Sequence, residues 1–128
     1  MTIESVTTPS VPLPSAPYTP CVRAGEWLVI SGQLGIDPMT GALADGVEAQ
    51  AAQALRNLAG ICADAAVTLA DVAKTTVFVT DLAAFGAVNA IYAEAFGAHR
   101  PARSTIQVAA LPFGGAIEIE AWVYAPRR

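Results

Sequence analysis

The chain has 128 residues, a formal net charge of −4 at pH 7, 54% apolar residues and 14% charged residues. This length predicts one domain with a single core, and so low a charged fraction indicates more buried surface than a small monomer needs. The acidic balance and the scattered Lys and Arg residues leave no basic footprint, so we do not expect a nucleic-acid partner.

The cysteine content and the N-terminal sequence bear on the compartment. Cys21 and Cys62 are too few for a disulfide framework, and the chain does not begin with a basic segment followed by an apolar run. No apolar stretch reaches the roughly 18 residues of a membrane span. We therefore expect a cytoplasmic protein with no membrane association.

The N-terminal segment is rich in proline, at positions 9, 12, 14, 17 and 20. Because proline lacks the N–H and restricts the residue before it, this segment is predicted to form neither a helix nor a central strand. We expect a single domain over residues 1–128, of which residues 1–16 form an extended proline-rich arm. A strand over residues 26–33 follows, and Asp37-Pro38 and Thr40-Gly41 then predict turns.

A helical pattern begins at Asp45, where Asp45 and Glu48 have the spacing of a capping box. Apolar residues then recur at three- and four-residue spacing, with polar residues on the opposite side. The apolar set is Val47, Ala51, Ala54, Leu55, Leu58, Ile61, Cys62 and Ala65, and the polar set is Glu48, Gln50, Gln53, Arg56 and Asn57.

The second half of the chain predicts a strand over residues 72–81 and a second helix that Asp81 can cap and that ends near Gly97. Its apolar stripe carries Leu82, Phe85, Val88, Tyr92 and Phe96. Strands over residues 104–109 and 116–124 follow. This order predicts an α/β (α+β) fold, with one mixed sheet and two helices on one face. The uncovered sheet face of so apolar a protein predicts self-association with cyclic symmetry.

Arg103 is a permanent cation at the start of an otherwise apolar strand. Alternation puts Arg103, Thr105 and Gln107 on one face of that strand. If this strand and the last one form a hairpin, Glu118 and Glu120 share that face. Two interpretations stay open: a structural ion pair between neighbouring strands, or an anchor for an anionic ligand beside a glutamate that activates water.

Other polar groups occupy constrained positions. Asn89 lies on the inward stripe of the second helix, where a buried amide needs a partner, and Ser31 and Tyr18 lie in constrained stretches. The single histidine, His99, has no second ligand at metal-binding spacing, so we expect no metal site. Cys21 is interpreted as a small buried hydrophobe.

Five segments fall, in order, into one pattern: PYTP, VISGQLGIDPMTG, VAKTTVFVTDLAAFGAVNAIYAEAF, RPARSTIQVAALP and IEIEAWV. They resemble the motifs of the RidA/YjgF family of enamine/imine deaminases from Pro17 to Val123. The resemblance implies a homotrimer of chorismate-mutase-like (bacillus type) subunits with active sites between neighbouring chains. It also implies hydrolysis of small 2-enamino and 2-imino acids to 2-oxo acids and ammonia, with no metal or organic cofactor.

Carried over by position, the resemblance implies that Arg103 holds the substrate carboxylate and that Glu118 positions the attacking water. Thr105 corresponds to a position that can offer its backbone N–H. The remaining residues that the resemblance implies around the cleft are Tyr18, Ser31 and Asn89.

The chain departs from the family pattern at positions that border the expected cleft, namely Thr19, Pro20, Leu34, Gly35 and Trp122. These departures leave two alternatives to the deaminase of small 2-imino acids. One alternative is a pathway-specific deaminase of another enamine, of the aminoacrylate or 2-aminomuconate type. The other is a non-catalytic trimer that binds 2-oxo acids in a regulatory role.

Overall fold

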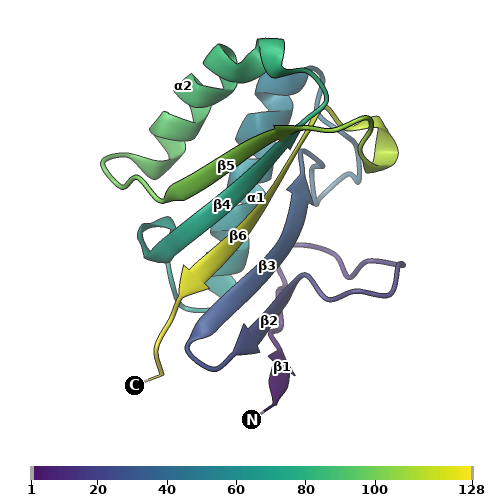
Figure 1. Cartoon of the computed structure of the whole chain (residues 1–128). Coiled ribbons are helices and arrows are strands. Elements are labelled where there is room, and N and C mark those ends of the chain that lie inside the picture. The colour runs from purple at the N-terminus through teal and green to yellow at the C-terminus, as the bar shows by residue number, and fades with distance from the viewer. Residues whose placement is uncertain (1, 128) are drawn as a thin grey trace.

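The computed structural model describes residues 2–127, whose elements form one layer of sheet and one layer of helix. In chain order these elements are β1 (Ile3–Ser5), β2 (Cys21–Ala24), β3 (Trp27–Leu34), α1 (Val47–Asp64), η1 (Leu69–Asp71), β4 (Val72–Val79), η2 (Leu82–Ala84), α2 (Phe85–Phe96), β5 (Ala102–Gln107), η3 (Pro112–Gly114) and β6 (Ile117–Tyr124). The strands form one mixed sheet in the order β1-β2-β3-β6-β4-β5, and Figure 1 shows α1 passing behind it. The expected mixed sheet with two helices on one face is confirmed.

The core lies between the sheet and the helices. The apolar stripes predicted for both helices supply much of it, with α2 burying Val88, Tyr92 and Phe96. β6 alternates as expected. Its core-facing residues, all fully buried, are Ile117, Ile119, Ala121 and Val123, and its outward residues are Glu118, Glu120, Trp122 and Tyr124.

The expected hairpin between the last two strands is wrong. β4 lies between them, pairing in parallel with β5 and antiparallel with β6. The connection explains this, because β4 and β5 are joined through α2, and a crossover through a helix brings two strands together in parallel.

This order changes which side chains share a face. Arg103 is paired with Thr75, which is fully buried under the helices, whereas Glu118 is paired with Phe78 on the other side of β4. Directly paired residues point to the same face of a sheet. The helix-facing set is therefore Arg103, Thr105 and Gln107, and the opposite set is Glu118 and Glu120, so the predicted common patch does not form within one chain.

The sheet face opposite the helices, which we call the open face, carries large exposed apolar side chains. Trp27, Ile106, Trp122 and Tyr124 lie on it, each 40% to 47% exposed. Trp27 and Tyr124 contact each other edge to face, with ring centroids 5.3 Å apart. The sheet face that the sequence predicts to be uncovered is thus apolar and uncovered in a single chain.

The starts of the helices differ in how they are capped. α1 has Gly46 as its N-cap, with φ 88° and no side-chain cap, so the capping box predicted for Asp45 and Glu48 is wrong. Asp81 does cap as expected, because its carboxylate accepts a hydrogen bond of 2.9 Å from the N–H of Ala83 at the start of η2, which leads into α2.

The N-terminal region joins the sheet at its edge. β1 pairs with β2, and β2 pairs with β3 through a tight turn in which Gly25 has φ 62°. Between β1 and β2, residues 6–20 form no helix or strand, as the prolines predict. Within residues 2–127, no helix has the length and apolar character needed to cross a bilayer.

Candidate active site

Arg103 is the centre of a first cluster, which we call the arginine cluster: Arg103, Asn89, Tyr92 and Phe85. The guanidinium Nη2 of Arg103, on β5, donates a hydrogen bond of 2.7 Å to Oδ1 of Asn89, on α2. Its Cζ lies 4.8 Å from the ring centroid of Tyr92 and 5.4 Å from that of Phe85. The amide expected to need a partner on the inward side of the second helix therefore has one, and that partner is Arg103.

The interpretation of Arg103 as an ion pair across the sheet is wrong for the single chain. Within residues 2–127 the one ion pair joins Arg127 to Glu4, at 2.6 Å and on the exposed surface. A guanidinium has five N–H donors in a fork that matches a carboxylate, and Asn89 accepts from one nitrogen. Among the described residues, the half-buried guanidinium of Arg103 therefore has no carboxylate partner.

Thr105 lies two residues beyond Arg103 on the same face of β5. β5 is the last strand in the sheet order, so its outer backbone groups pair with no other strand among the described residues. An edge strand of this kind offers free N–H groups to a ligand beside the guanidinium.

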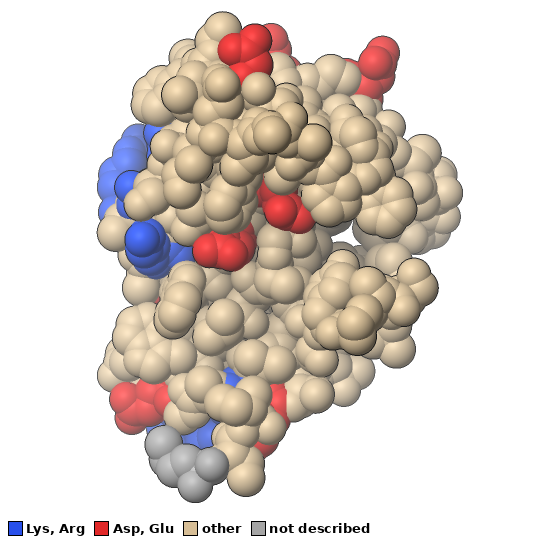
Figure 2. Space-filling view, turned by 45° about the vertical axis from the view of Figure 1, so that its right-hand side comes forward, with Lys and Arg blue, Asp and Glu red and all other residues tan. Residues whose placement is uncertain are grey.

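A second cluster lines a pocket of about 560 Å³ that contains Glu118, on the opposite face of the sheet from Arg103. Tyr18, Ser31 and Glu118 line this pocket, which we call the glutamate pocket. Its walls come from the proline-rich arm, the end of β3 and the η3 loop, with Pro112 and Phe113 on the η3 side. Figure 2 shows a hollow on the right-hand side of this view, and acidic side chains near the middle of the face.

The Glu118 side chain lies close to Gly32 in this pocket. A Cβ on Gly32 would lie 2.6 Å from Cδ of Glu118, so a larger residue at position 32 would displace the Glu118 side chain. Burial raises the pKa of the Glu118 carboxyl, and the neighbouring Glu120 raises it further. The Ser31 hydroxyl, also in this pocket, is buried without a hydrogen-bond partner among the described residues. These groups can hold and deprotonate a water molecule.

Two amides on α1 support the pocket, although the helical pattern predicts that both lie on the polar side of the helix. Asn57 donates to the carbonyls of Leu34 and Ile36, at 3.2 and 2.9 Å. Gln50 donates to the carbonyl of Ala44 and accepts from the N–H of Ala116. Their seven-residue spacing, on the same side as the apolar stripe, is the signal that could have identified them as buried.

The single histidine and the two cysteines lie outside both clusters. His99 Nε2 lies 2.7 Å from the carbonyl of Val72. Burial raises the pKa of Cys21 to about 11 and that of Cys62 to about 12, and Cys21 is fully buried, as expected for a small hydrophobe. Within residues 2–127, no three His, Cys, Asp or Glu side chains are grouped closely enough to hold a metal ion.

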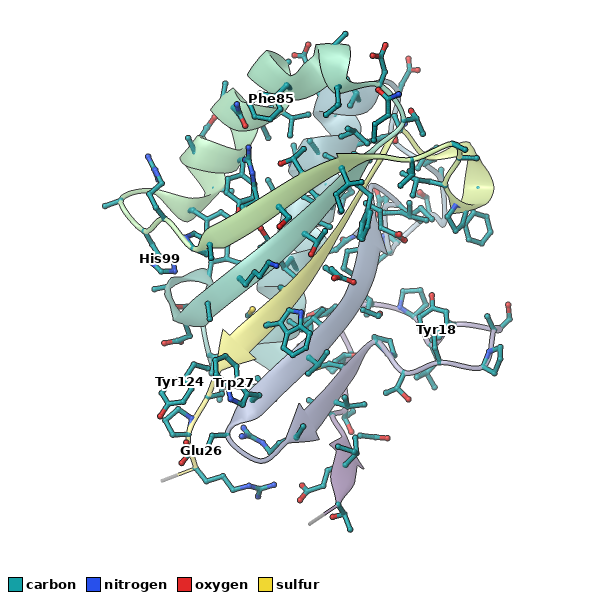
Figure 3. The ribbon with its side chains drawn as sticks, viewed as in Figure 1. Tyr18, Glu26, Trp27, Phe85, His99 and Tyr124 are labelled. Atoms are coloured by element: carbon teal, nitrogen blue, oxygen red, sulfur yellow. The ribbon has the colours of Figure 1, made fainter. Side chains whose placement is uncertain are left out.

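The two clusters stay apart in one chain. Figure 3 shows Phe85 at α2, at the top of the view, and Tyr18 on the loop that extends to the right beyond β2 and β3. The pocket lining includes Glu118 but neither Arg103 nor Asn89. The predicted site residues thus form two half-sites, one on each side of the sheet.

The fold and the two half-sites define a small α+β protein with an open apolar sheet face and polar groups on both sides of its sheet. The family model described as Endoribonuclease L-PSP matches residues 8–125. The chain belongs to the RidA/YjgF family, which confirms the resemblance seen in its motifs.

Individual relatives match along most of the chain. The 2-iminobutanoate/2-iminopropanoate deaminase of Salmonella typhimurium is 44% identical over 121 residues, covering 92% of this chain and 94% of that protein. The human protein of the same name is 43% identical over 117 residues, covering 91% and 85%. Among solved structures, RidA from an Antarctic Psychrobacter has a TM-score of 0.91 at 40% identity, covering 94% of this chain and 98% of that one. The YjgF gene product of E. coli has a TM-score of 0.90 at 41% identity, covering 98% and 99%.

Proposed function

We propose that this protein is an imine deaminase that hydrolyses small 2-imino acids, and their 2-enamino tautomers, to 2-oxo acids and ammonia. The two relatives named 2-iminobutanoate/2-iminopropanoate deaminase support this, at 43% and 44% identity. The observation that carries the proposal is Arg103, a half-buried cation with no carboxylate partner among residues 2–127 and with donors left for a ligand. Such a cation selects a substrate with a carboxylate.

We further propose that the working site lies between two copies of the chain in a homotrimer. Arg103, Asn89 and Thr105 come from one copy, and Glu118, with Tyr18 and Ser31, comes from its neighbour. Support comes from the separation of the two half-sites, because one chain cannot bring Arg103 and Glu118 to one ligand. The apolar open face supports it too, since large exposed apolar patches favour association.

The proposed chemistry needs only the substrate and water. Arg103 binds the carboxylate, and the protonated imine carbon is electrophilic. Glu118 accepts a proton from a water molecule as the water oxygen bonds to the imine carbon and the C=N π pair moves to nitrogen. Glu118 then returns this proton to the amine nitrogen, and the carbinolamine expels ammonia as the C–N bond breaks, the hydroxyl proton passes to Glu118 and the C–O bond becomes a carbonyl. Positioning of the water and fixed charge at the carboxylate supply most of the acceleration.

The test uses threonine dehydratase to release 2-iminobutanoate and semicarbazide to trap it. Wild-type protein should reduce trapping, and Arg103→Ala should abolish that reduction while the assembly stays intact by light scattering. Arg56→Ala, an exposed arginine on α1, is the matched control and should keep full activity. Retained activity in Arg103→Ala would remove the carboxylate anchor from the proposal.

The same assay separates the alternatives. A wild-type protein that is inactive on 2-iminobutanoate but active on aminoacrylate or a 2-aminomuconate would be a pathway-specific deaminase. One that binds 2-oxobutanoate without turning over any imine would be a regulatory binding protein. RNA cleavage, which the family model's description names, finds no support in a chain of net charge −4.

A further inference from the structure

Arg103 must hold its guanidinium in one place if it is to bind a carboxylate without a large loss of entropy. An arginine side chain carries many rotamers, and ordering it on binding weakens a complex. The hydrogen bond to Asn89 fixes one nitrogen of the fork at 2.7 Å. By itself, this single bond leaves the guanidinium plane free to turn about it.

Tyr92 supplies the second point of contact. Its ring lies under the guanidinium, with the Arg103 Cζ 4.8 Å from the ring centroid, a distance at which the negative face of the ring attracts a cation. Phe85 is farther, at 5.4 Å, and is 44% exposed, whereas Tyr92 is only 6% exposed. Tyr92 is therefore the better shielded of the two rings.

Two contacts hold the side chain of Tyr92 in place. Its hydroxyl lies 2.6 Å from the Thr75 hydroxyl, and Thr75 is fully buried on β4. Thr75 is also the residue paired with Arg103 across the β4–β5 register. The ring also packs against Phe96, with ring centroids 4.6 Å apart. Thr75 on β4 thus pairs with Arg103 in the sheet and also contacts the hydroxyl of Tyr92, whose ring lies against the Arg103 guanidinium.

We propose that Tyr92 is a positioning residue for the carboxylate anchor: tied to Thr75, its ring holds the Arg103 guanidinium ready for the substrate carboxylate. This inference rests on the proposed function, since it needs Arg103 to bind that carboxylate. In this role Tyr92 acts through its contact with the Arg103 guanidinium.

The test measures binding of two stable probes by calorimetry: 2-oxobutanoate, which carries the carboxylate, and its amide, which does not. Tyr92→Leu should weaken 2-oxobutanoate binding by about three- to tenfold, the cost of ordering one long side chain, and leave amide binding unchanged. Tyr92→Phe keeps the ring and should restore most of the affinity for the acid. Val88→Ala removes a similarly buried side chain from the same helix, at 3% exposure, and should leave the acid-to-amide ratio at the wild-type value.

A double-mutant cycle separates this role from a purely structural one. In an Arg103→Met background, Tyr92→Leu should cause no further loss of 2-oxobutanoate affinity, because the group it positions is gone. If Arg103→Met weakens acid binding and Tyr92→Leu does not, the positioning role is overturned and the anchor stands. Equal losses for acid and amide would overturn it as well. If Arg103→Met leaves acid binding intact, the proposed function itself fails, and this inference fails with it.

Discussion

At the scale of single residues, Glu118 is the group whose ionisation should set the pH response. The proposed base is the carboxylate, and burial and Glu120 both raise its pKa above the ordinary value for glutamate. As pH falls, Glu118 is therefore protonated earlier than an exposed glutamate would be. Activity should decline on the acid side at a correspondingly higher pH.

Glu120→Gln removes the like charge beside Glu118 and leaves its burial in place. The pKa of Glu118 should then fall, so the acid limb of the kcat/KM profile should move to lower pH than in the wild type. Glu94→Gln, an exposed carboxylate on α2, is the control and should leave the profile unmoved. Comparing variants cancels the titration of the imine substrate itself. An unmoved acid limb in Glu120→Gln would mean that another group limits activity.

At the scale of elements, α1 does more than fill the core, because its buried amides fasten the loop after β3. Asn57→Ala would leave the carbonyls of Leu34 and Ile36 without their donor at a site where Asn57 is 7% exposed. Leaving such groups unsatisfied costs about 1–3 kcal/mol. We expect that loss in the free energy of unfolding by urea at fixed protomer concentration.

Arg56→Ala, on the exposed side of the same helix, is the matched variant and should change the free energy of unfolding by less than about 0.5 kcal/mol. Equal stabilities for the two variants would show that Asn57 contributes nothing specific. Activity of Asn57→Ala should also fall, since the loop it fastens lines the glutamate pocket through Leu34 and Ile36.

The elements themselves were largely predictable, and their pairing was not. A stripe such as Ala51 to Leu58 or an alternation such as Ile117 to Ile119 is visible because one face of each element is buried. Pairing depends on contacts distant in sequence, and the assumption that consecutive strands form a hairpin failed at β5. The helix between β4 and β5 was the usable signal, because it requires a parallel neighbour. The hairpin assumption instead led to the wrong prediction that Arg103 and Glu118 lie on the same face of the sheet.

The site residues show the same division. Arg103 and Asn89 were separately recognisable as polar groups in apolar patterns, and the structure joins them. Tyr92 was predicted only as part of an apolar stripe, because nothing in the sequence shows that a strand residue, Thr75, reaches its hydroxyl. Periodicity predicts which face of one element is buried, but it does not predict contacts between side chains of different elements.

At the scale of the whole molecule, the opposite positions of the two half-sites make a prediction about mixed assemblies. Arg103→Ala and Glu118→Gln should each be inactive alone. If each site takes its arginine from one chain and its glutamate from the next, a mixed trimer contains intact sites, built from the Arg103 of one variant and the Glu118 of the other. Random mixing of equal amounts should restore about one site in four.

The decisive comparison is with a pair of variants from the same half-site. Arg103→Ala mixed with Asn89→Ala should restore no sites, because both residues must come from one chain and each variant lacks one of them. The mixtures are unfolded and refolded together, and deaminase activity is measured at equal protomer concentration. Restoration in the first mixture and none in the second requires a site shared between chains. No restoration in either would mean that the two half-sites do not meet across an interface, and that Glu118 acts elsewhere.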